Sequence, residues 1–559
     1  MLKTIFWQYQ IEFPQEAQRQ GQFESILETP SQDTLLSRTN MVGHVTASGI
    51  LIWRSKSKVL LVKHPGLNDF YQPGGHFKSP SETPLAVATR HVEGVLGTSA
   101  FRHFPTHSDP SLPIDIDTHP IPAYEAMHEG VHVHFDFRYL FILEEPTNRS
   151  DADTDSLRWE NINELSRRRT FEALVPKIEK ALTQVHTRLF FEDVCLPLQQ
   201  FQDVSCVVVA HFIPDVYPYL HALKQHFRVL GIIPKPNSIV ADVETRLQAT
   251  FKIYHWSRAD IKSLNPLLEL VRSTDNRFLM IDIGGYFSGI INDLAKKVGQ
   301  RFVGLVEDTE NGHQKYEKAA TTAPLSVPVV SVARSPLKQN EDFLVGQSIL
   351  FSTDFILREF GQLVQYLQCA ILGYGKIGSS IAHHLLLRGA KPWVYDTNPI
   401  RRASALNQLC NAPPRQYIVK NADVIFCATG NRALDITDFR CLKPGCIVVS
   451  VTSADDELDL RYVHAEYKTD NVTRHLTKHS SFANYFYLAN KGNAINFVHN
   501  AVLGDWIHLV RGEMLHAAAY LLKEAPAPGL GELPAKEREH VVETWLRIFV
   551  DERGDYSNH

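Results

Sequence analysis

Short apolar runs alternate with helix-like segments through most of the second half of the chain. The helix-like segments, such as YPYLHALKQH, repeat apolar residues near the 3.6-residue period of an α-helix. Strands that alternate with helices build an open, mostly parallel sheet. The pattern from about residue 200 onward therefore predicts the α/β class. The apolar runs include SCVVVAHF, FRVLGIIP, RFLMIDIGG, RFVGLVED, VPVVSVA, ADVIFCATG and CLKPGCIVVSVT.

The first part of the chain follows a different pattern. Residues 1–40 are polar and mixed, with two possible short helices. From about 44 to 145, β-rich runs such as KVLLVKH and VHVHFDFRYLFIL alternate with turns, and residues 159–191 contain helical stretches. Near the other end of the chain, the Pro/Gly-rich segment 525–535 is interpreted as a linker that precedes an amphipathic helix.

The composition is that of an ordinary globular protein, with 44% hydrophobic and 21% charged residues. A net charge of −5 over 559 residues argues against nucleic-acid binding by general electrostatics. There is no apolar run long enough to span a bilayer, so no membrane contact is expected. The seven cysteines lie mainly in apolar runs, as buried thiols of a reducing compartment do. We therefore expect a cytoplasmic protein.

Residues 370–396, AILGYGKIGSSIAHHLLLRGAKPWVYD, have the form of a dinucleotide-binding strand–turn–helix–strand unit. Gly373 permits the tight turn, Gly375 lets the backbone approach the pyrophosphate, and Gly378 lets the helix pack on the strand. The pyrophosphate then lies at the helix N-terminus. Asp396 is placed to accept hydrogen bonds from a ribose diol and to repel a 2′-phosphate. The motif predicts NAD rather than NADP. The alternative is a glycine-bearing α/β crossover that binds no cofactor.

The motifs around this unit resemble S-adenosylhomocysteine hydrolase. GYGKIGSSIA, VYDTNP, ADVIFCATGNRALDITDF and LANKGNAINF follow one another with the spacing of that family, and IDIGGYFSG and GLVEDTENGHQKYEK look like parts of its outer domain. The resemblance covers about residues 200–525. It implies a two-lobed module in which a bound NAD⁺ oxidises a ribose hydroxyl, a 5′-substituent is eliminated, water adds and the hydride returns.

The resemblance also implies further cofactor contacts. Thr429 lies in the matching Ala-Thr-Gly turn, and Asn496 matches an Asn near the nicotinamide. Thr309 keeps one of three consecutive threonines, whereas Glu310 and Asn311 replace the other two. The cofactor contacts of this last loop are therefore in question.

The positions that match the family's catalytic residues are only partly kept. Lys338 and Asp342 fall where the family handles the 3′-hydroxyl proton and the ribose, and Asp308 falls at a position that faces the substrate. Ile283 replaces a catalytic aspartate, and Phe343 replaces an asparagine. The alternative for Lys338 and Asp342 is a residual ion pair without a catalytic role.

Two family histidines are missing. Thr452-Ser453 stands in place of a Gly-His pair, and the segment 234–238, PKPNS, has no histidine where the early catalytic one is expected. Histidine shuttles protons near neutral pH, and the loss of such a group costs about 10²–10⁴-fold in rate. We expect the full hydrolytic cycle to be lost, while Lys338 and Asp342 still support oxidation of an alcohol.

Residues 63–98 resemble the signature of the Nudix hydrolases, and the likeness extends through PIDIDTHPIPA and VHVHFDFRYLF. Gly75 is followed by six residues before Glu82, one more than in the family, and Arg90 stands at the expected distance. The family's glutamate cluster is broken. His91 occupies one glutamate position, and Gly94-Val95 occupies the glutamate pair.

A hard cation such as Mg²⁺ needs several oxygen ligands, which this box does not supply. We expect a Nudix fold without diphosphate cleavage, in which Glu82, Arg90 and Glu93 form ion pairs that brace the helix. His132 and His134 alternate along one strand and are interpreted as core or hydrogen-bonded residues rather than ligands. No metal site is expected.

The resulting fold class is α/β, with a Nudix α/β/α sandwich followed by a two-lobed module that contains a doubly wound parallel Rossmann sheet. The expected parts of the chain are an N-terminal extension (1–40), the Nudix-like domain (41–190), the outer domain (195–365), the Rossmann domain (366–500), and C-terminal helices with a tail (501–559).

Three functions remain open from the sequence. The first is an NAD-binding paralogue of the hydrolase that acts on or senses a nucleoside-like ligand. The second is a non-enzymatic scaffold, and the third is a 2-hydroxyacid dehydrogenase, which requires an Arg and a His in the cleft. The resemblance implies a homo-oligomer in which the tail of one chain places a Lys and a Tyr at a neighbouring cofactor site. In the tail DERGDYSNH, Tyr556 matches the tyrosine, but no lysine accompanies it.

Overall fold

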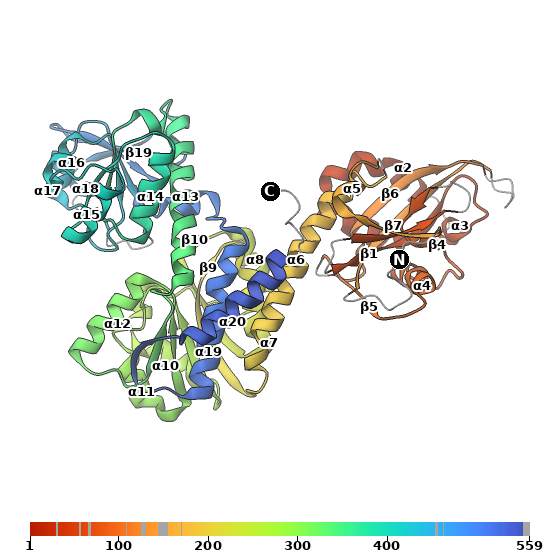
Figure 1. Cartoon of the computed structure of the whole chain (residues 1–559), viewed down its shortest axis with the longest axis horizontal. Helices are drawn as coiled ribbons and strands as arrows, with labels where there is room; N and C mark the ends of the chain where they lie inside the picture. Colours follow the sequence, from red (N-terminus) through yellow and green to blue (C-terminus); the bar gives the residue numbers. More distant parts are fainter. Residues whose placement is uncertain are drawn as a thin grey trace. The chain divides into compact units, whose positions relative to one another are not determined.

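The computed structural model describes residues 1–551 except 29–31, 55–57, 65–68, 108, 124–129, 144–154, 169, 453–456 and 462. The chain forms two units, Met1–Phe190 with Trp545–His559, and Phe191–Thr544 (Figure 1). Each unit has its own hydrophobic core. The expected tail residue Tyr556 lies outside the described residues.

The first unit is built on a mixed sheet in which the long central strands β1 and β7 run parallel. The strand order is β3-β2-β1-β7-β5, with β4 paired to β1, β6 to β7 and β8 to β2. The strands are β1 (His44–Trp53), β2 (Lys58–Lys63), β3 (Phe70–Tyr71), β4 (Gly74–His76), β5 (Phe101–His103), β6 (Asp115–Ile121), β7 (His132–Leu143) and β8 (Leu157–Asn161).

Helices cover the apolar side chains of this sheet. Phe135 and Phe137 of β7 are buried, and Phe23 of a helix packs on them with its ring 4.7 Å from that of Phe135. His134, Asp136 and Arg138 alternate with these rings and lie on the other face, because successive side chains of a strand point to opposite faces. The helices are α1 (Leu2–Glu12), α2 (Ala17–Leu27), α3 (Gln32–Leu36), α4 (Pro84–Leu96), α5 (Ile162–Leu165) and α6 (Val175–Val194).

The second unit begins with a lobe, here called the outer lobe, that contains a fully parallel six-stranded sheet. The order is β10-β9-β11-β12-β13-β21. The chain adds β10 on one side of β9 and the later strands on the other side, so the order in which strands are added reverses between β9 and β11. The strands are β9 (Val204–Phe212), β10 (Arg228–Ile239), β11 (Arg277–Asp282), β12 (Phe302–Glu307), β13 (Pro328–Ser331) and β21 (Gly529–Glu532). The parallel α/β sheet expected from the sequence is confirmed.

The interpretation of 525–535 as a linker is wrong, because β21 within it adds to the sheet edge beside β13. The final helix is confirmed as α20 (Ala535–Leu546). The other helices of this lobe are α7 (Val216–His226), α8 (Ala241–Gln248), α9 (Arg258–Ile261), α10 (Leu264–Arg272), α11 (Ile291–Val298), α12 (Glu310–Thr322) and α19 (Ile507–Glu524).

The other lobe of the second unit, here called the Rossmann lobe, has a seven-stranded sheet of order β15-β14-β16-β17-β20-β19-β18. The strands from β15 to β20 are parallel, and β19 and β18 are antiparallel. The strands are β14 (Cys369–Leu372), β15 (Trp393–Tyr395), β16 (Val424–Cys427), β17 (Cys446–Ser450), β18 (Lys468–Asn471), β19 (Leu476–Ser480) and β20 (Tyr485–Ala489).

The long helix α13 (Pro336–Glu359) contacts both α14 and α19 and so connects the two lobes (Figure 1). The remaining helices of the Rossmann lobe are α14 (Lys376–Leu387), α15 (Pro399–Asn407), α16 (Arg415–Asn421), α17 (Ile436–Cys441) and α18 (Val463–Glu466). The chain adds β15 on one side of β14 and β16 on the other, so the strand order reverses at β14. Open α/β sheets bind their ligands at the carboxyl ends of the strands at such a reversal.

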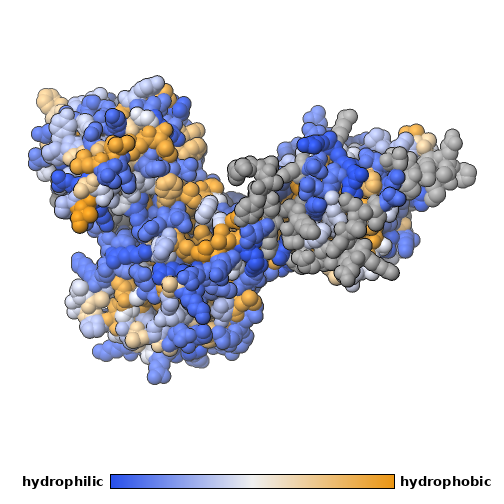
Figure 2. All heavy atoms as spheres, viewed as in Figure 1, coloured by the Kyte–Doolittle hydropathy of each residue, from blue (hydrophilic) through white to orange (hydrophobic). Residues whose placement is uncertain are grey.

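All seven cysteines are free thiols, and each is buried except Cys441. Hydrophilic side chains predominate on the face of each unit shown in Figure 2, with hydrophobic ones in small groups between them. Among the described residues, no helix is both long and apolar enough to cross a bilayer.

Candidate functional site

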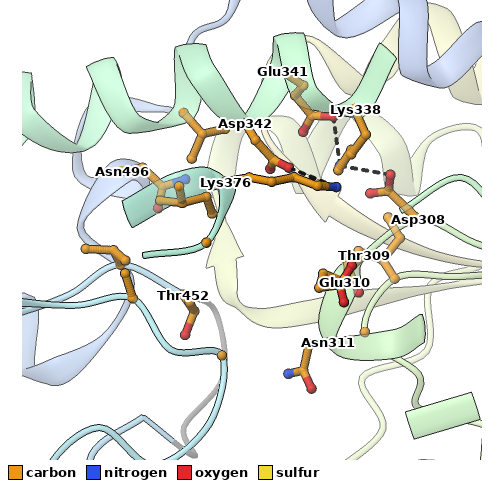
Figure 3. A pocket seen from close by; sticks show the side chains of 18 of the residues that line it. Asp308, Thr309, Glu310, Asn311, Lys338, Glu341, Asp342, Lys376, Thr452 and Asn496 are labelled. Carbon is orange, nitrogen blue, oxygen red and sulfur yellow. Dashed lines mark hydrogen bonds and ion pairs between the residues drawn. The ribbon is translucent and has the colours of Figure 1, made fainter. Parts of the chain in front are cut away.

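A cavity of about 830 Å³ lies in the second unit, between the carboxyl ends of its two parallel sheets. The Rossmann lobe contributes the glycine loop after β14 and the residues after β15 and β16. The outer lobe contributes residues at the ends of β9, β10 and β12, together with the first turns of α13. One cavity thus joins the predicted cofactor residues to the predicted catalytic residues (Figure 3).

The three glycines of the loop have different roles. Gly373 has φ +98°, and a Cβ on it would collide with the carbonyl oxygen of Ala428. A Cβ on Gly378 would collide with the carbonyl oxygen of Gly373, so this glycine permits close packing of α14. Gly375 differs, since its nearest neighbour would be Arg401 Nη1 at 3.9 Å. Gly375 is the N-cap of α14 and leaves an open approach to the helix N-terminus, which fits a pyrophosphate.

Asp396 supports the glycine loop from the end of β15. Its carboxylate accepts hydrogen bonds from the backbone N–H groups of Tyr374 and Asn398, both at 2.7 Å, and it is buried. Arg401 Nη1 lies 3.6 Å from the same carboxylate. The predicted ribose contact is compatible with this position, because each carboxylate oxygen accepts more than one hydrogen bond.

The other predicted cofactor residues all line the cavity. The side-chain oxygen of Asn496 is buried and has no hydrogen-bond partner in the part of the chain that the structure describes. A buried amide oxygen without a partner is costly, so this atom fits a donor such as the nicotinamide carboxamide. The hydroxyl of Thr429 donates to Glu457 at 2.8 Å. Thr309 caps α12, and its hydroxyl donates to Glu307 at 2.7 Å.

The predicted catalytic residues form a buried charged network. Lys338 Nζ lies 3.0 Å from Asp308 and 2.7 Å from Glu341, and Figure 3 shows these three side chains pointing toward one another. Asp342 lies 3.7 Å from Lys376 instead. The carboxylates in direct contact with Lys338 are thus those of Asp308 and Glu341, and Asp342 acts on the ammonium group from a greater distance.

Burial opposes the charge of Lys338, but Asp308, Glu341 and Asp342 outweigh it and raise the pKa of the lysine, which stays charged. Burial raises the pKa of Glu341 to about 7, against the opposite effect of Lys338. Glu341 was not singled out from the sequence. Its position three residues after Lys338 places both on the same face of a helix, and this spacing was an available signal.

Two further residues of the cavity were also missed. Lys235 and His211 stand at the carboxyl ends of β10 and β9, where open α/β sheets place ligand-binding residues. Burial lowers the pKa of Lys235 to about 8, although Glu307, Asp308 and Asp282 act in the opposite direction. This lysine lies within PKPNS, the segment noted for its lack of histidine.

His211 supplies an imidazole from a different strand. Its Nδ1 lies 2.5 Å from the hydroxyl of Ser238, and its ring stacks on Phe497 at 5.0 Å. Burial, together with Lys235, Lys338 and other cations, lowers its pKa well below the usual value, so the ring is neutral. The two family positions still hold no histidine, although Ser453 lies outside the described residues. The cavity nevertheless contains one neutral imidazole.

The residues that depart from the family pattern around the cavity also have defined contacts. Glu310 forms an ion pair with Arg334 at 2.8 Å, and Asn311 lines the cavity. Ile283 is buried at the end of β11 and offers no proton-transfer group. Thr452 donates a hydrogen bond to Glu457 at 3.1 Å.

The segment that resembles the Nudix signature lies in the first unit. Arg90 Nε lies 3.1 Å from Glu82, and the backbone N–H of Lys78 donates to Glu82 at 2.6 Å. The two oxygens of Glu82 are thus used within the chain, as the ion-pair interpretation predicts. Glu93 is exposed. His132 and His134 lie on β7 with their Nε2 atoms 3.0 Å apart, within hydrogen-bond distance of each other.

Comparison with known proteins identifies part of the second unit. Residues 347–498 match the family "S-adenosyl-L-homocysteine hydrolase, NAD binding domain". The adenosylhomocysteinase of Thermotoga maritima is 29% identical over 185 residues, which are 33% of this chain and 45% of that protein. That of Triticum aestivum is 27% identical over 191 residues, which are 34% of this chain and 39% of that protein. The match thus spans less than half of either relative.

Two solved structures are similar to parts of the chain. A putative D-3-phosphoglycerate dehydrogenase from Ralstonia solanacearum covers 57% of this chain and 95% of its own, with 12% identity and a TM-score of 0.35. The Ap4A hydrolase of C. elegans covers 24% of this chain and 93% of its own, with 16% identity and a TM-score of 0.17.

The second unit therefore contains an NAD-binding Rossmann domain, which is similar to that of the S-adenosylhomocysteine hydrolases. The prediction of NAD from the glycine motif is confirmed by the family match. The sheet order, the open approach at Gly375 and the partnerless oxygen of Asn496 agree with it.

Proposed function

We propose that the second unit is an NAD⁺-dependent oxidoreductase that oxidises a hydroxyl group of a nucleoside-like ligand without completing adenosylhomocysteine hydrolysis. The observation that carries this proposal is the single cavity that contains the cofactor loop at Gly375, the charged Lys338 network and Lys235. The glycine loop and the two lysines, whose pKa values are shifted in opposite directions, thus line the same space.

The lysines would have different roles in this reaction. Lys338 remains charged and donates hydrogen bonds, so it orients the hydroxyl oxygen of the ligand together with Asp342. Lys235 loses its proton near pH 8, so its neutral amine accepts the hydroxyl proton. NAD⁺ held by the Gly375 loop, Asp396 and Asn496 would accept the C–H electron pair of the ligand as a hydride, so that the alcohol would become a ketone.

The later hydrolytic steps have less support among the residues of the cavity. Elimination and water addition each need a group that moves a proton at the correct atom. Ile283 and Ser453 replace two of the family's groups, an aspartate and a histidine, with side chains that do not titrate near neutral pH. His211 is neutral, but its Nδ1 is engaged with Ser238 and its ring is held against Phe497.

A second candidate is oxidation of a 2-hydroxy acid. The specific observation in its favour is that His211 and Arg511 both line the cavity, as this function requires. Arg511 binds Asp215 with 2.6 Å between Nη2 and the carboxylate, so a substrate carboxylate would compete with that aspartate. For this reason the nucleoside-like substrate remains the leading proposal, and a scaffold or sensor role remains the non-enzymatic alternative.

One experiment separates these functions. The purified full-length protein is assayed for bound nicotinamide by mass spectrometry and absorbance, and adenosine analogues or 2-hydroxy acids are then added. Reduction of the bound cofactor by nucleosides alone supports the leading proposal, and turnover with hydroxy acids supports the second candidate. A bound cofactor that no ligand reduces supports the sensor.

We also propose that the first unit is a Nudix-like domain without Mg²⁺-dependent diphosphate cleavage. The proposal rests on the Glu82–Arg90 ion pair and on His91, Gly94 and Val95 at the family's glutamate positions. These residues leave no group of carboxylates that satisfies a hard cation.

A further inference from the structure

Five histidines from four strands of the first unit gather on one face of the sheet. They are His44 of β1, His76 of β4, His119 of β6, and His132 and His134 of β7. His134 is the direct cross-strand partner of both His44 and His119. Directly paired residues project to the same face of a sheet, so the strand register itself brings these rings together.

Three of the rings have the spacing of metal ligands. His44, His76 and His134 each offer a ring nitrogen within 4.8 Å of the other two. Their ring centroids are 5.0, 4.7 and 5.2 Å apart in the three pairs. The Nε2 atoms of His44 and His76 are 3.0 Å apart. Two such nitrogens on a tetrahedral zinc ion, with bonds of about 2.0–2.1 Å, stand about 3.3 Å apart, so a small outward shift admits the ion.

The hydrogen bonds at the edge of the cluster favour metal-ligand tautomers. Nδ1 of His44 lies 3.0 Å from the backbone oxygen of Asn40, and Nδ1 of His132 lies 2.7 Å from that of Gly130. A carbonyl oxygen only accepts hydrogen bonds, so each Nδ1 carries the proton. Each Nε2 then presents its lone pair to the cluster, which is the usual arrangement of a histidine ligand and its supporting carbonyl.

Asp117 lies 2.9 Å from Nδ1 of His119, so a carboxylate supports the outermost ring. The Nε2 atoms of His44 and His76 face each other 3.0 Å apart, with a proton of His76 between them. A divalent cation in place of that proton bonds to both nitrogens.

We propose that His44, His76 and His134 bind one divalent transition-metal ion of the zinc class, with a fourth position left for water. Neutral imidazoles suit zinc, cobalt, nickel or copper, whereas Mg²⁺ and Ca²⁺ need oxygen ligands. The site adjoins the degenerate Nudix box, because a Cβ on Gly75 would lie 2.7 Å from Nε2 of His91. It is independent of the redox function proposed for the second unit.

The test uses untagged, full-length protein freed of metal with a chelator. Zn²⁺ and Mg²⁺ are titrated by calorimetry, and Co²⁺ is titrated with a visible spectrum that reports ligand type and geometry. We expect one Zn²⁺ or Co²⁺ per chain, a cobalt spectrum of nitrogen ligands without a thiolate charge-transfer band, and no heat from Mg²⁺. Thermal unfolding is expected at higher temperature with Zn²⁺ than without it.

The variants are His76→Gln and His134→Gln, with His103→Gln as the control. His103 is a half-buried histidine of the same unit, on β5, and stands outside the cluster. Each cluster variant is expected to weaken Zn²⁺ binding at least about 100-fold, and the control is expected to bind like the unaltered chain. His76 is only partly buried, so His76→Gln serves if His134→Gln does not fold. Absence of stoichiometric Zn²⁺ and Co²⁺ binding to the unaltered chain, or binding that survives His76→Gln unchanged, overturns the proposal.

Discussion

The ammonium nitrogen of Lys338 lies 3.0 Å from the carboxylate of Asp308, so a buried ion pair connects the first turn of α13 to the end of β12. Both residues line the cavity that also contains the glycine loop of the Rossmann lobe. A ligand that reaches the predicted cofactor site thus meets a fixed positive charge with carboxylates on either side.

Replacement of Lys338 by Met is expected to abolish cofactor reduction while the protein still binds NAD. The change leaves Asp308 and Glu341 buried without their cation, which costs about 3–5 kcal/mol of the free energy of unfolding. Denaturant unfolding measures this loss. The double variant Lys338→Met/Glu341→Gln is expected to recover part of the stability but none of the reduction. Full activity in the single variant would contradict the assigned role.

Gly375→Ala and Gly378→Ala separate cofactor binding from folding. Gly375 has φ −79° and open space around its Cβ position, so alanine fits there but stands where a pyrophosphate approaches. We expect a fold of normal stability and at least about tenfold weaker NAD binding by calorimetry. Gly378→Ala instead forces a clash with the backbone of Gly373 and is expected to lower stability by about 1–3 kcal/mol. Equal NAD affinity in Gly375→Ala and the unaltered chain would argue against a pyrophosphate site at Gly375.

The carboxylate of Asp396 is expected to set the preference for NAD over NADP. In Asp396→Ser the repulsion of a 2′-phosphate is lost, and Arg401, now 3.6 Å from the carboxylate, becomes free to bind that phosphate. The ratio of the two dissociation constants is expected to shift toward NADP by at least about tenfold. Asp470→Ser, at an exposed position of β18, is the control. An unchanged ratio in Asp396→Ser would show that selectivity has another source.

The rate of cofactor reduction is expected to rise with pH through about 8. Burial lowers the pKa of Lys235 to about 8, and only its neutral amine accepts a proton, so the active fraction grows as the pH passes this value. Stopped-flow measurement of reduction between pH 6 and 10 checks the profile. Lys235→Met is expected to lose about 10²–10⁴-fold in rate, whereas the surface variant Lys296→Met keeps the profile. A rate that falls across this range would contradict the role of Lys235.

Mg²⁺ or Mn²⁺ is expected to give no turnover of nucleoside-diphosphate substrates. Glu82→Gln should then change only stability, by up to about 1 kcal/mol, because its ion pair with Arg90 is near the surface. Phosphate release and thermal unfolding measure the two effects. Robust turnover that is lost in Glu82→Gln would show that the box still holds a catalytic cation.

Local patterns were sufficient to predict the cofactor half of the site. The turn at Gly373, the helix start at Gly375 and the acid at Asp396 are close in sequence, and one strand–helix–strand unit positions them all. The parallel sheets follow from strand–helix alternation. The edge strand β21 was missed because it pairs through backbone groups and its sequence, GLGE, lacks the apolar alternation of a strand.

The substrate half depends on long-range packing that spacing does not reveal. Lys235 and His211 line the cavity from different strands. Lys338 forms its ion pair with Asp308 rather than Asp342, because β12 ends beside α13. The histidine cluster of the first unit is similar in this respect. His132 and His134 were visible as neighbours, but only the pairing of β1, β4 and β7 brings His44 and His76 to them.

The most direct test is to purify the full-length protein, identify its bound nicotinamide cofactor and follow the near-ultraviolet absorbance of the reduced form as adenosine is added. The account predicts tightly bound NAD⁺ that adenosine reduces, without formation of homocysteine from adenosylhomocysteine. Absence of bound NAD⁺ after reconstitution, or hydrolysis of adenosylhomocysteine at a rate typical of that enzyme family, would contradict it.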